Sequence, residues 1–182
     1  MHAQPRTPDN ASTAYPAYGF SHRELMLCVA LQQRLRHPAL LALMRTVSRL
    51  GNGIFWYALM ALLLAAGHLQ AAFRMAVAGV AGVLLYKWLK KVTSRPRPYA
   101  RGGTVVALTA PLDEFSFPSG HTLHAVAFTL VACFYLPLLA WVLVPFTLLI
   151  ALSRVVLGLH FPSDVLAGAA IGSLLAVLVL MA

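Results

Sequence analysis

The sequence contains few charged residues and very few acids. Only five of its 182 residues are Asp or Glu, and charged residues of both signs make up 10% of the chain, whereas a soluble domain usually carries about 25%. Hydrophobic residues make up 60%, and they gather in long blocks without the period of a surface helix or strand. This composition excludes an ordinary soluble domain and indicates that lipid surrounds most of the chain.

Cysteine is also scarce. Cys28 and Cys133 each lie in an apolar stretch, so we expect neither a disulfide framework nor a zinc site and interpret both as small hydrophobic residues. The first twenty residues hold no continuous apolar core, so we do not expect a cleavable signal peptide. Residues 1–20 are predicted to form a flexible polar tail.

The shortage of acids leaves the chain strongly basic. Fourteen Lys and Arg give a formal net charge of +9. Nucleic-acid-binding proteins place such residues on a solvated face, but here they stand at the ends of apolar blocks. We therefore expect no nucleic-acid partner, and we expect lipid headgroups or a phosphate to bind these residues.

Five apolar blocks fill the chain from residue 51 onward. They cover residues 54 to about 68, a stretch that ends near 89, and residues 119–136, 138–153 and 163–181. We predict five transmembrane helices in one domain, residues 51–182, although the first block is somewhat shorter than the roughly 20 residues that a crossing needs. Trp56 and Tyr57 open the first block, where an interfacial aromatic belt is expected.

Residues 21–50 have a different character. Five arginines interrupt their apolar runs, namely Arg23, Arg34, Arg36, Arg45 and Arg49. Each Arg at the bilayer centre costs roughly 2.5–3.5 kcal/mol, so we predict two amphipathic helices, broken near Pro38, that lie in the membrane interface. The predicted fold is all-α, a polytopic membrane bundle with interfacial N-terminal helices.

Polar motifs stand at the ends of the apolar blocks. Lys90 is followed after six residues by Arg97-Pro98, Pro118-Ser119-Gly120-His121 opens the third block, and Ser153-Arg154 precedes His160 and Asp164. With five spans, the loop 92–118 and the segment 154–162 lie on one side of the membrane. The motifs can therefore meet.

Several of these residues suit the binding of a phosphate. Lys90, Arg97 and Arg154 supply charged donors from separate parts of the chain, and such donors make strong bonds to phosphate oxygens. Ser119 and Gly120 stand where an apolar helix begins, and the free N–H groups of a helix N-terminus form an anion site that glycine lets a ligand approach. The sequence therefore predicts a phosphate site.

The remaining motif residues suit covalent catalysis. Pro162 fits the first position of the last helix, which places Asp164 in its first turn. A carboxylate there can accept a bond from one ring nitrogen of His160 and leave the other free to attack. His121 is expected in a first helical turn, beside the phosphate. Because an intramembrane acid indicates function, we interpret His160, Asp164 and His121 as catalytic.

Other polar residues receive simpler interpretations. Lys and Arg at span ends usually anchor a helix in the interface, and we assign that role to Lys87, Lys91, Arg95 and Arg101. His68 and His124 are interpreted as helix residues with satisfied hydrogen bonds. Asp113 and Glu114 are interpreted as solvated loop charges, with a minor role in shaping the pocket left open.

These motifs resemble the signature of the phosphatidic acid phosphatase type 2 family, the lipid phosphate phosphatases, whose site is shared with vanadium haloperoxidases. The signature K-x6-RP, PSGH and SR-x5-H-x3-D is matched at every position between residues 90 and 164. The resemblance implies a helical membrane fold with six spans, one more than the five counted here. Residues 1–50 lie outside it.

Residues and resemblance together predict a metal-independent, cofactor-free phosphatase. His160 attacks phosphorus to form a phosphohistidine, and Asp164 holds its tautomer. His121 protonates the departing lipid oxygen and then activates water. Lys90, Arg97, Ser119, Gly120 and Arg154 stabilise the phosphoryl oxygens.

Alternatives stay open at this stage. A lipid phosphotransferase would use the same phosphohistidine with an alcohol as acceptor, and a non-catalytic protein would only bind lipid phosphate. A soluble haloperoxidase does not fit the apolar chain. Candidate substrates are undecaprenyl diphosphate, phosphatidylglycerol phosphate, phosphatidic acid and a lipid A phosphate. The short loop 99–117 favours a simple phosphate or diphosphate.

The side of the membrane that holds the site is not fixed. The resemblance implies a bacterial inner membrane protein with a periplasmic site. With five spans, however, nearly all Lys and Arg fall on the active-site side, which the positive-inside rule makes cytoplasmic. A span within residues 24–44 would reduce that conflict.

Overall fold

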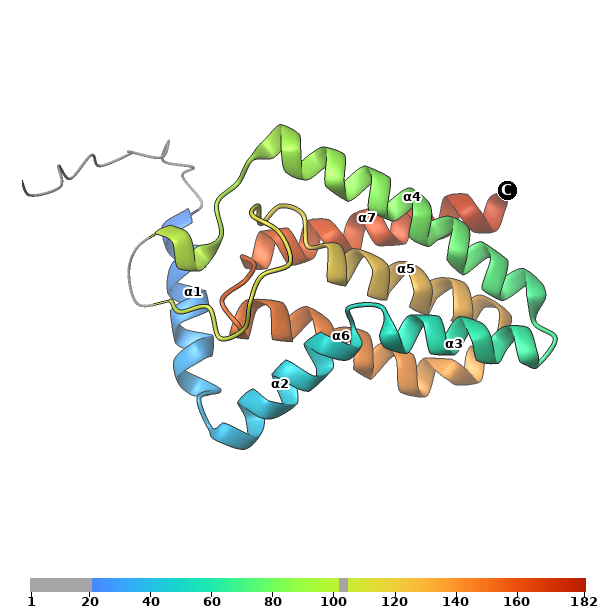
Figure 1. Cartoon of the computed structure of the whole chain (residues 1–182), viewed down its shortest axis with the longest axis horizontal. Coiled ribbons are helices and arrows are strands. Elements are labelled where there is room, and N and C mark those ends of the chain that lie inside the picture. Colours follow the sequence, from blue (N-terminus) through green and yellow to red (C-terminus); the bar gives the residue numbers. More distant parts are fainter. Residues whose placement is uncertain (1–20, 102–104) are drawn as a thin grey trace, which may run out of the picture.

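The computed structural model describes residues 21–101 and 105–182, and this part of the chain is helical without any strand (Figure 1). The predicted tail 1–20 lies outside it. The helices are α1 (Ser21–Arg34), α2 (Pro38–Leu50), α3 (Ile54–Ala65), α4 (Leu69–Thr93), η1 (Pro98–Arg101), α5 (Gly120–Tyr135), η2 (Pro137–Leu139), α6 (Ala140–Val156) and α7 (Pro162–Met181). The predicted all-α class is confirmed for the described residues.

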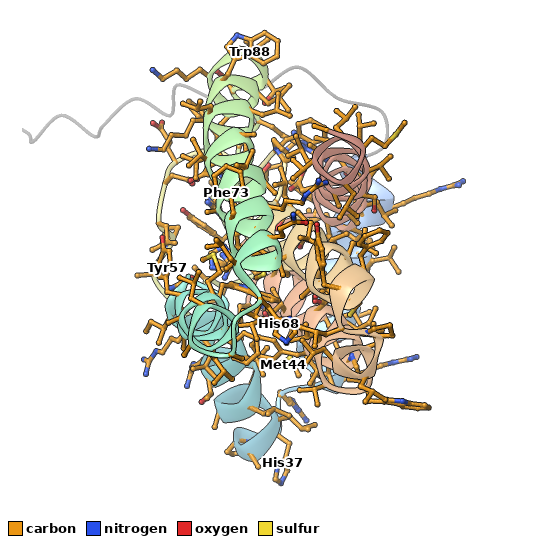
Figure 2. The ribbon with its side chains drawn as sticks, turned by 90° about the vertical axis from the view of Figure 1, so that its right-hand side faces the viewer. His37, Met44, Tyr57, His68, Phe73 and Trp88 are labelled. Carbon is orange, nitrogen blue, oxygen red and sulfur yellow. The ribbon has the colours of Figure 1, made fainter. Side chains whose placement is uncertain are left out.

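Each of the five apolar blocks forms a helix where the sequence predicted one, from α3 to α7. Three segments are long and apolar enough to cross a membrane, namely Leu69–Arg101, Pro137–Val156 and Pro162–Met181. The pair α2 and α3, bent by 52°, could supply a fourth crossing, and α5 is apolar but shorter. Large apolar side chains such as Phe73 and Trp88 point outward (Figure 2), and each is at least 60% exposed. The surface of the bundle therefore suits lipid.

Helix α5 lies at the centre, against α4, α6 and α7. Small residues bring its backbone close to α7: a Cβ atom on Gly168 would lie 2.6 Å from the Ser119 carbonyl oxygen, and one on Gly172 would lie 2.4 Å from that of Leu123. Ser119 N also donates to the Asp164 carbonyl oxygen at 3.0 Å. This glycine-mediated packing places the motif at the start of α5 beside the start of α7.

The first block corrects one prediction. Trp56 is 1% exposed, and its ring lies 5.0 Å from that of Phe55, 5.4 Å from Phe128 and 5.9 Å from Phe146. Trp56 therefore belongs to the core and not to an aromatic belt, whereas Tyr57 is 70% exposed. Adjacent residues of an α-helix point about 100° apart, so the two rings cannot share one environment.

The N-terminal segment forms two helices that break before Pro38, as predicted. Helix α1 packs against α6 and α7, and α2 packs against α6. Helices α3 to α7 run along the long axis of the molecule, while α1 lies across one end of them (Figure 1). Gln32 ties α1 to the loop after η1, because its Nε2 donates to the Val106 carbonyl oxygen at 2.7 Å. The N-terminal helices therefore cover one end of the bundle.

Candidate active site

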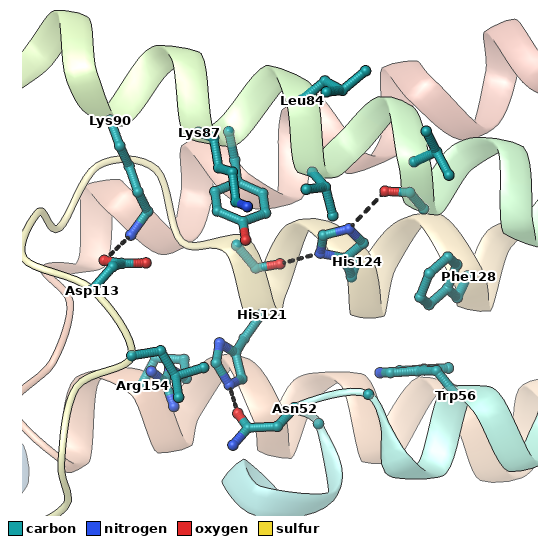
Figure 3. Close-up of a pocket in the computed structure, with 18 of the residues that line it drawn as sticks. Asn52, Trp56, Leu84, Lys87, Lys90, Asp113, His121, His124, Phe128 and Arg154 are labelled. Atoms are coloured by element: carbon teal, nitrogen blue, oxygen red, sulfur yellow. Dashed lines mark hydrogen bonds and ion pairs between the residues drawn. The ribbon is translucent and has the colours of Figure 1, made fainter.

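The three motifs meet at that end of the bundle. They border one cavity of about 840 Å³, whose polar lining residues include Lys90, Arg97, Asp113, His121, Arg154 and His160 (Figure 3). Lys90 comes from the last turns of α4, His121 from the first turn of α5 and Arg154 from the last turn of α6. The predicted convergence of the motifs is therefore seen in the structure.

Asp113 connects two of the cations, so this partly exposed loop acid has the role in shaping the pocket that the sequence left open. Its Oδ1 accepts from Lys90 Nζ at 2.6 Å and from Arg97 Nη2 at 2.7 Å, and Arg97 Nε donates to the Asp113 carbonyl oxygen at 3.0 Å. Burial raises the pKa of the Asp113 carboxyl, but the bonds and charges of Lys90 and Arg97 outweigh it and lower that pKa below its usual value. Asp113 stays ionised between its two partners.

Arg154 has no acidic partner among residues 21–101 and 105–182. Its side chain is buried, Nη1 donates to Ser48 Oγ, and Nε has no hydrogen-bond partner. Among the residues that the structure describes, Arg154 forms no ion pair. A buried charge without a counter-ion is costly. An anion in this cavity would remove that cost.

The contacts of His160 fix its tautomer. Its Nδ1 lies 2.6 Å from the Ser116 carbonyl oxygen, and its Nε2 lies 3.4 Å from Arg97 Nη1. A carbonyl oxygen only accepts and a guanidinium only donates, so the hydrogen is on Nδ1 and Nε2 carries the lone pair. Burial, followed by the charges of Arg154, Arg97 and Lys90, lowers the pKa of His160 well below its usual value. The ring is therefore neutral at physiological pH.

The predicted hydrogen bond between His160 and Asp164 is absent, because Asp164 Oδ2 lies 3.8 Å from His160 Nδ1. Oδ2 instead accepts from Phe161 N at 2.8 Å, and Oδ1 accepts from Arg95 Nη1 at 2.5 Å. The reason is local: Asp164 occupies the third position of α7, from which a carboxylate reaches back to the cap of its own helix. The Ser116 carbonyl takes the place assigned to the carboxylate.

Arg95 is not an interfacial anchor, which corrects its interpretation from the sequence. Its guanidinium bridges two acids, with Nη1 on Asp164 and Nη2 2.7 Å from Glu24 Oε2, and it lies over the Phe161 ring at 4.3 Å. Glu24 Oε1 also accepts from Ser163 N at 2.9 Å. Helix α1, which lies outside the resemblance, thus supports the turn that carries His160.

The second imidazole is held from a place that the sequence did not indicate. His121 Nε2 contacts the Oδ1 of Asn52, which lies between α2 and α3 (Figure 3). Ser119 caps α5, and its Oγ lies 3.0 Å from Thr122 Oγ1, so this hydroxyl is engaged with its own helix. Gly120 and His121 border the cavity directly.

His124 behaves as predicted. Its Nδ1 lies 2.9 Å from the Gly120 carbonyl oxygen and its Nε2 lies 3.2 Å from that of Gly79, so either tautomer of the neutral ring donates to a backbone carbonyl. Lys87 and Lys91 also border the cavity. Their role as anchors stays a prediction.

Comparison with known families agrees with this geometry. The PAP2 superfamily model matches residues 67–182. The chain belongs to the PAP2 superfamily. Every signature motif lies within that match, whereas Glu24, Ser48 and Asn52 precede it.

Individual PAP2 relatives extend the likeness. The chain is 33% identical to decaprenylphosphoryl-5-phosphoribose phosphatase of Mycobacterium tuberculosis over 82% of its own length and 85% of that protein. It is 37% identical to undecaprenyl-diphosphatase BcrC of Bacillus subtilis over 50% of its own length, a match that spans only 46% of that relative.

A solved PAP2 structure shares the fold. The transmembrane PAP2-type phosphatidylglycerolphosphate phosphatase of Bacillus subtilis has a TM-score of 0.71 and 27% identity, over 89% of this chain and 87% of the other. This likeness and the apolar helices identify the chain as a multi-pass membrane protein.

Proposed function

We propose that this protein is a lipid phosphate phosphatase that works through a phosphohistidine on His160. The neutral His160 ring carries the main support, because His160 borders the cavity and its Nε2 keeps the lone pair beside the guanidinium of Arg97. Protonation would remove the nucleophile, and the cations that lower the pKa of His160 keep it available.

The reaction has two in-line steps. In the first, His160 Nε2 bonds to phosphorus, the bond from phosphorus to the lipid oxygen breaks, and His121, which the negative charge of the bound phosphate keeps protonated, gives its proton to that oxygen. In the second, water attacks phosphorus while His121 takes a proton from it. The bond from phosphorus to Nε2 breaks and phosphate leaves, so both imidazoles return to their starting states.

The cations and one helix terminus stabilise the phosphoryl oxygens in this proposal. Lys90, Arg97 and Arg154 border the cavity, and the N-terminus of α5 adds the Gly120 N–H, with Ser119 as its cap. Fixed donors of this kind stabilise charge that develops in the transition state. Asp164 acts indirectly, because it caps the turn that carries His160.

We propose that no metal ion takes part. Among residues 21–101 and 105–182, no group of three or more His, Cys, Asp or Glu side chains could hold a metal. Asp113, the acid nearest to the cations, already accepts from Lys90 and Arg97. The cations therefore supply the charge that Mg²⁺ supplies in many phosphoryl transfers.

The other end of the cavity supports a lipid substrate. Its apolar lining includes Trp56, Met60, Val80, Leu84 and Phe128, from α3, α4 and α5. A ligand with a phosphate head and a hydrocarbon tail would match both ends. The names of the relatives point to prenyl and glycerol lipids, and the short loop after η1 favours a simple monoester or diphosphate.

The placement in the membrane is part of the proposal. Helices α3 to α7 form five spans of a bacterial inner membrane, and α1, which crosses the end of the bundle (Figure 1), lies with α2 in the interface beside the site. Cysteine labelling of loop 99–117 in intact cells determines which side that is. Labelling by an impermeant reagent places the site in the periplasm.

Phosphate release tests the function. Purified protein should release inorganic phosphate from undecaprenyl diphosphate, phosphatidylglycerol phosphate, phosphatidic acid or a lipid A phosphate in excess EDTA, and vanadate should inhibit it. Acid-labile phosphate on His160 should appear during rapid-quench turnover. Loss of activity in EDTA that added metal restores would contradict the metal-free mechanism, and phosphate found on an added alcohol would identify a phosphotransferase.

A further inference from the structure

The corner between α2 and α3 carries a polar side chain into the active-site cavity. The two helices meet at 52°, and the sequence between them is Gly51-Asn52-Gly53. Asn52 lines the cavity beside His121 (Figure 3). This corner precedes the family match, which begins at residue 67, so no signature motif assigns it a role.

The shape of the corner favours glycine at position 53, and Gly51 packs closely against α6. Gly53 has a φ of 125°, where side chains are strained, and a Cβ atom there would lie 2.8 Å from the Tyr57 ring. A Cβ atom on Gly51 would lie 3.1 Å from Ile150 of α6. The corner therefore packs closely on both sides, which fixes where Asn52 stands.

The contact between Asn52 and His121 defines which ring nitrogen is free. Asn52 Oδ1 faces His121 Nε2, and an amide oxygen only accepts. The hydrogen therefore resides on Nε2, and Nδ1 is the nitrogen left to exchange a proton. The same logic holds for His160, where the Ser116 carbonyl holds the hydrogen on Nδ1 and Nε2 keeps the lone pair.

We propose that Asn52 is a positioning residue for His121, which holds the proton on Nε2 so that Nδ1 gives and takes the proton of the reaction. This inference rests on the proposed phosphatase function. In the first step the Nδ1–H proton moves to the lipid oxygen, and in the second Nδ1 takes a proton from water. Nε2–H stays bonded to Asn52 throughout.

Two substitutions at Asn52 give opposite expectations for the pH profile. The titratable and charged groups that act on His121 are Arg154, His160, His124 and Lys90, and all remain in both variants. Asn52→Ala removes the acceptor that stabilises the protonated ring, so the alkaline limb of kcat should move to lower pH. Asn52→Asp provides a charged acceptor, so the limb should move to higher pH.

The size of the effect follows from the role of a general acid. Such a group contributes about 10²–10⁴-fold, so a misplaced His121 ring in Asn52→Ala should lower kcat by about 10- to 100-fold. KM should change little, because the hydrogen bond of the Asn52 side chain goes to His121 and not to Lys90, Arg97 or Arg154. Asn52→Asp should recover much of the lost kcat near neutral pH.

The experiment compares wild type, Asn52→Ala and Asn52→Asp in phosphate release across pH, with thermal unfolding in detergent for each. Wild type that releases no phosphate would end the proposed function itself. If wild type is active, an Asn52→Ala variant with unchanged kcat and pH profile would overturn the inference. Loss of kcat in both variants with wild-type pH limbs would also overturn it, because Asn52 would then support only the fold.

Discussion

The two imidazoles of the site are held in chemically similar but structurally different ways. His160 Nδ1 meets the backbone carbonyl of Ser116, whereas His121 Nε2 meets the side-chain carbonyl of Asn52. A backbone carbonyl persists through any substitution at its residue, but a side-chain carbonyl does not. The proposed nucleophile is therefore fixed by the main chain, and the proposed general acid by a single replaceable side chain.

The surroundings of the two imidazoles also differ in burial. His160 lies between α6 and α7, where Arg95 ties Asp164 to Glu24, and it is 2% exposed. His121 lies in the first turn of α5 and faces the corner at Asn52, which is exposed. A nucleophile must approach phosphorus in one geometry, whereas an acid must serve both a lipid oxygen and water. The rigid setting of His160 therefore suits the proposed nucleophile, and the more exposed setting of His121 suits the proposed general acid.

The strongest test separates the two imidazoles. His160→Ala should abolish turnover, by about 10⁴-fold or more, because no phosphohistidine can form. His121→Ala should keep a slow first step and accumulate the phosphohistidine, since water is no longer activated. Rapid-quench measurement of protein-bound phosphate checks both, with His68→Ala at the exposed start of α4 as the matched histidine control. Bound phosphate in His160→Ala would refute the assignment.

The ion pairs that Arg95 forms with Asp164 and Glu24, beside His160, should contribute to the stability of the protein. Arg95→Ala leaves buried Asp164 and half-buried Glu24 without their cation, and breaking a buried pair in this way costs about 3–5 kcal/mol. Unfolding in detergent should show that loss, whereas Lys91→Ala, at an exposed position on α4, should unfold like wild type. A stable Arg95→Ala variant would mean that α1 does not support the turn of His160.

Arg154 borders the cavity together with both imidazoles, and its replacement should lower kcat by less than the replacement of His160. Arg154→Ala removes a cation with no acidic partner among the described residues, and the loss of one such donor lowers kcat by about 10²–10³-fold. Arg154→Lys should recover only part of this, because an ammonium cannot reproduce the guanidinium geometry. Turnover of Arg49→Ala, at the neighbour of Ser48, provides the control. A loss below about fivefold would argue against Arg154 as a phosphate ligand.

The sequence predicted the parts of the site that depend on residue type and spacing. Lys90, Arg97 and Arg154 stand at or beside helix ends that meet at one cavity, and the apolar blocks located α3 to α7. The N-terminus of α5 and the first turn of α7 were also predicted, because Ser119 and Pro162 are strong helix-start signals.

The sequence could not predict contacts that depend on how the ends fold over one another. The Ser116 carbonyl carries no side-chain signal, and Gly-Asn-Gly at residue 52 reads only as a turn. Arg95 has the same sequence context as an interfacial anchor, and only the packing of α1 places Glu24 beside it. Asp113 reads as a loop charge until the loop after η1 brings it to Lys90.

Replacing Asp113 by Asn should give the smallest change in function, because Asp113 acts only through Lys90 and Arg97. Asp113→Asn keeps an oxygen that can accept from Lys90 and Arg97 but removes a negative charge from the anion site. Unit charges about 5 Å apart interact by roughly 3 kcal/mol at an effective dielectric of 20, and reorientation of the cations should reduce this to about a tenfold tighter inhibition by vanadate. The low pKa of Asp113 makes the difference independent of pH above about 5. Asp113→Ala, which lacks the acceptor, should lose turnover instead, and equal behaviour of the two variants would show that the carboxylate does not orient the cations.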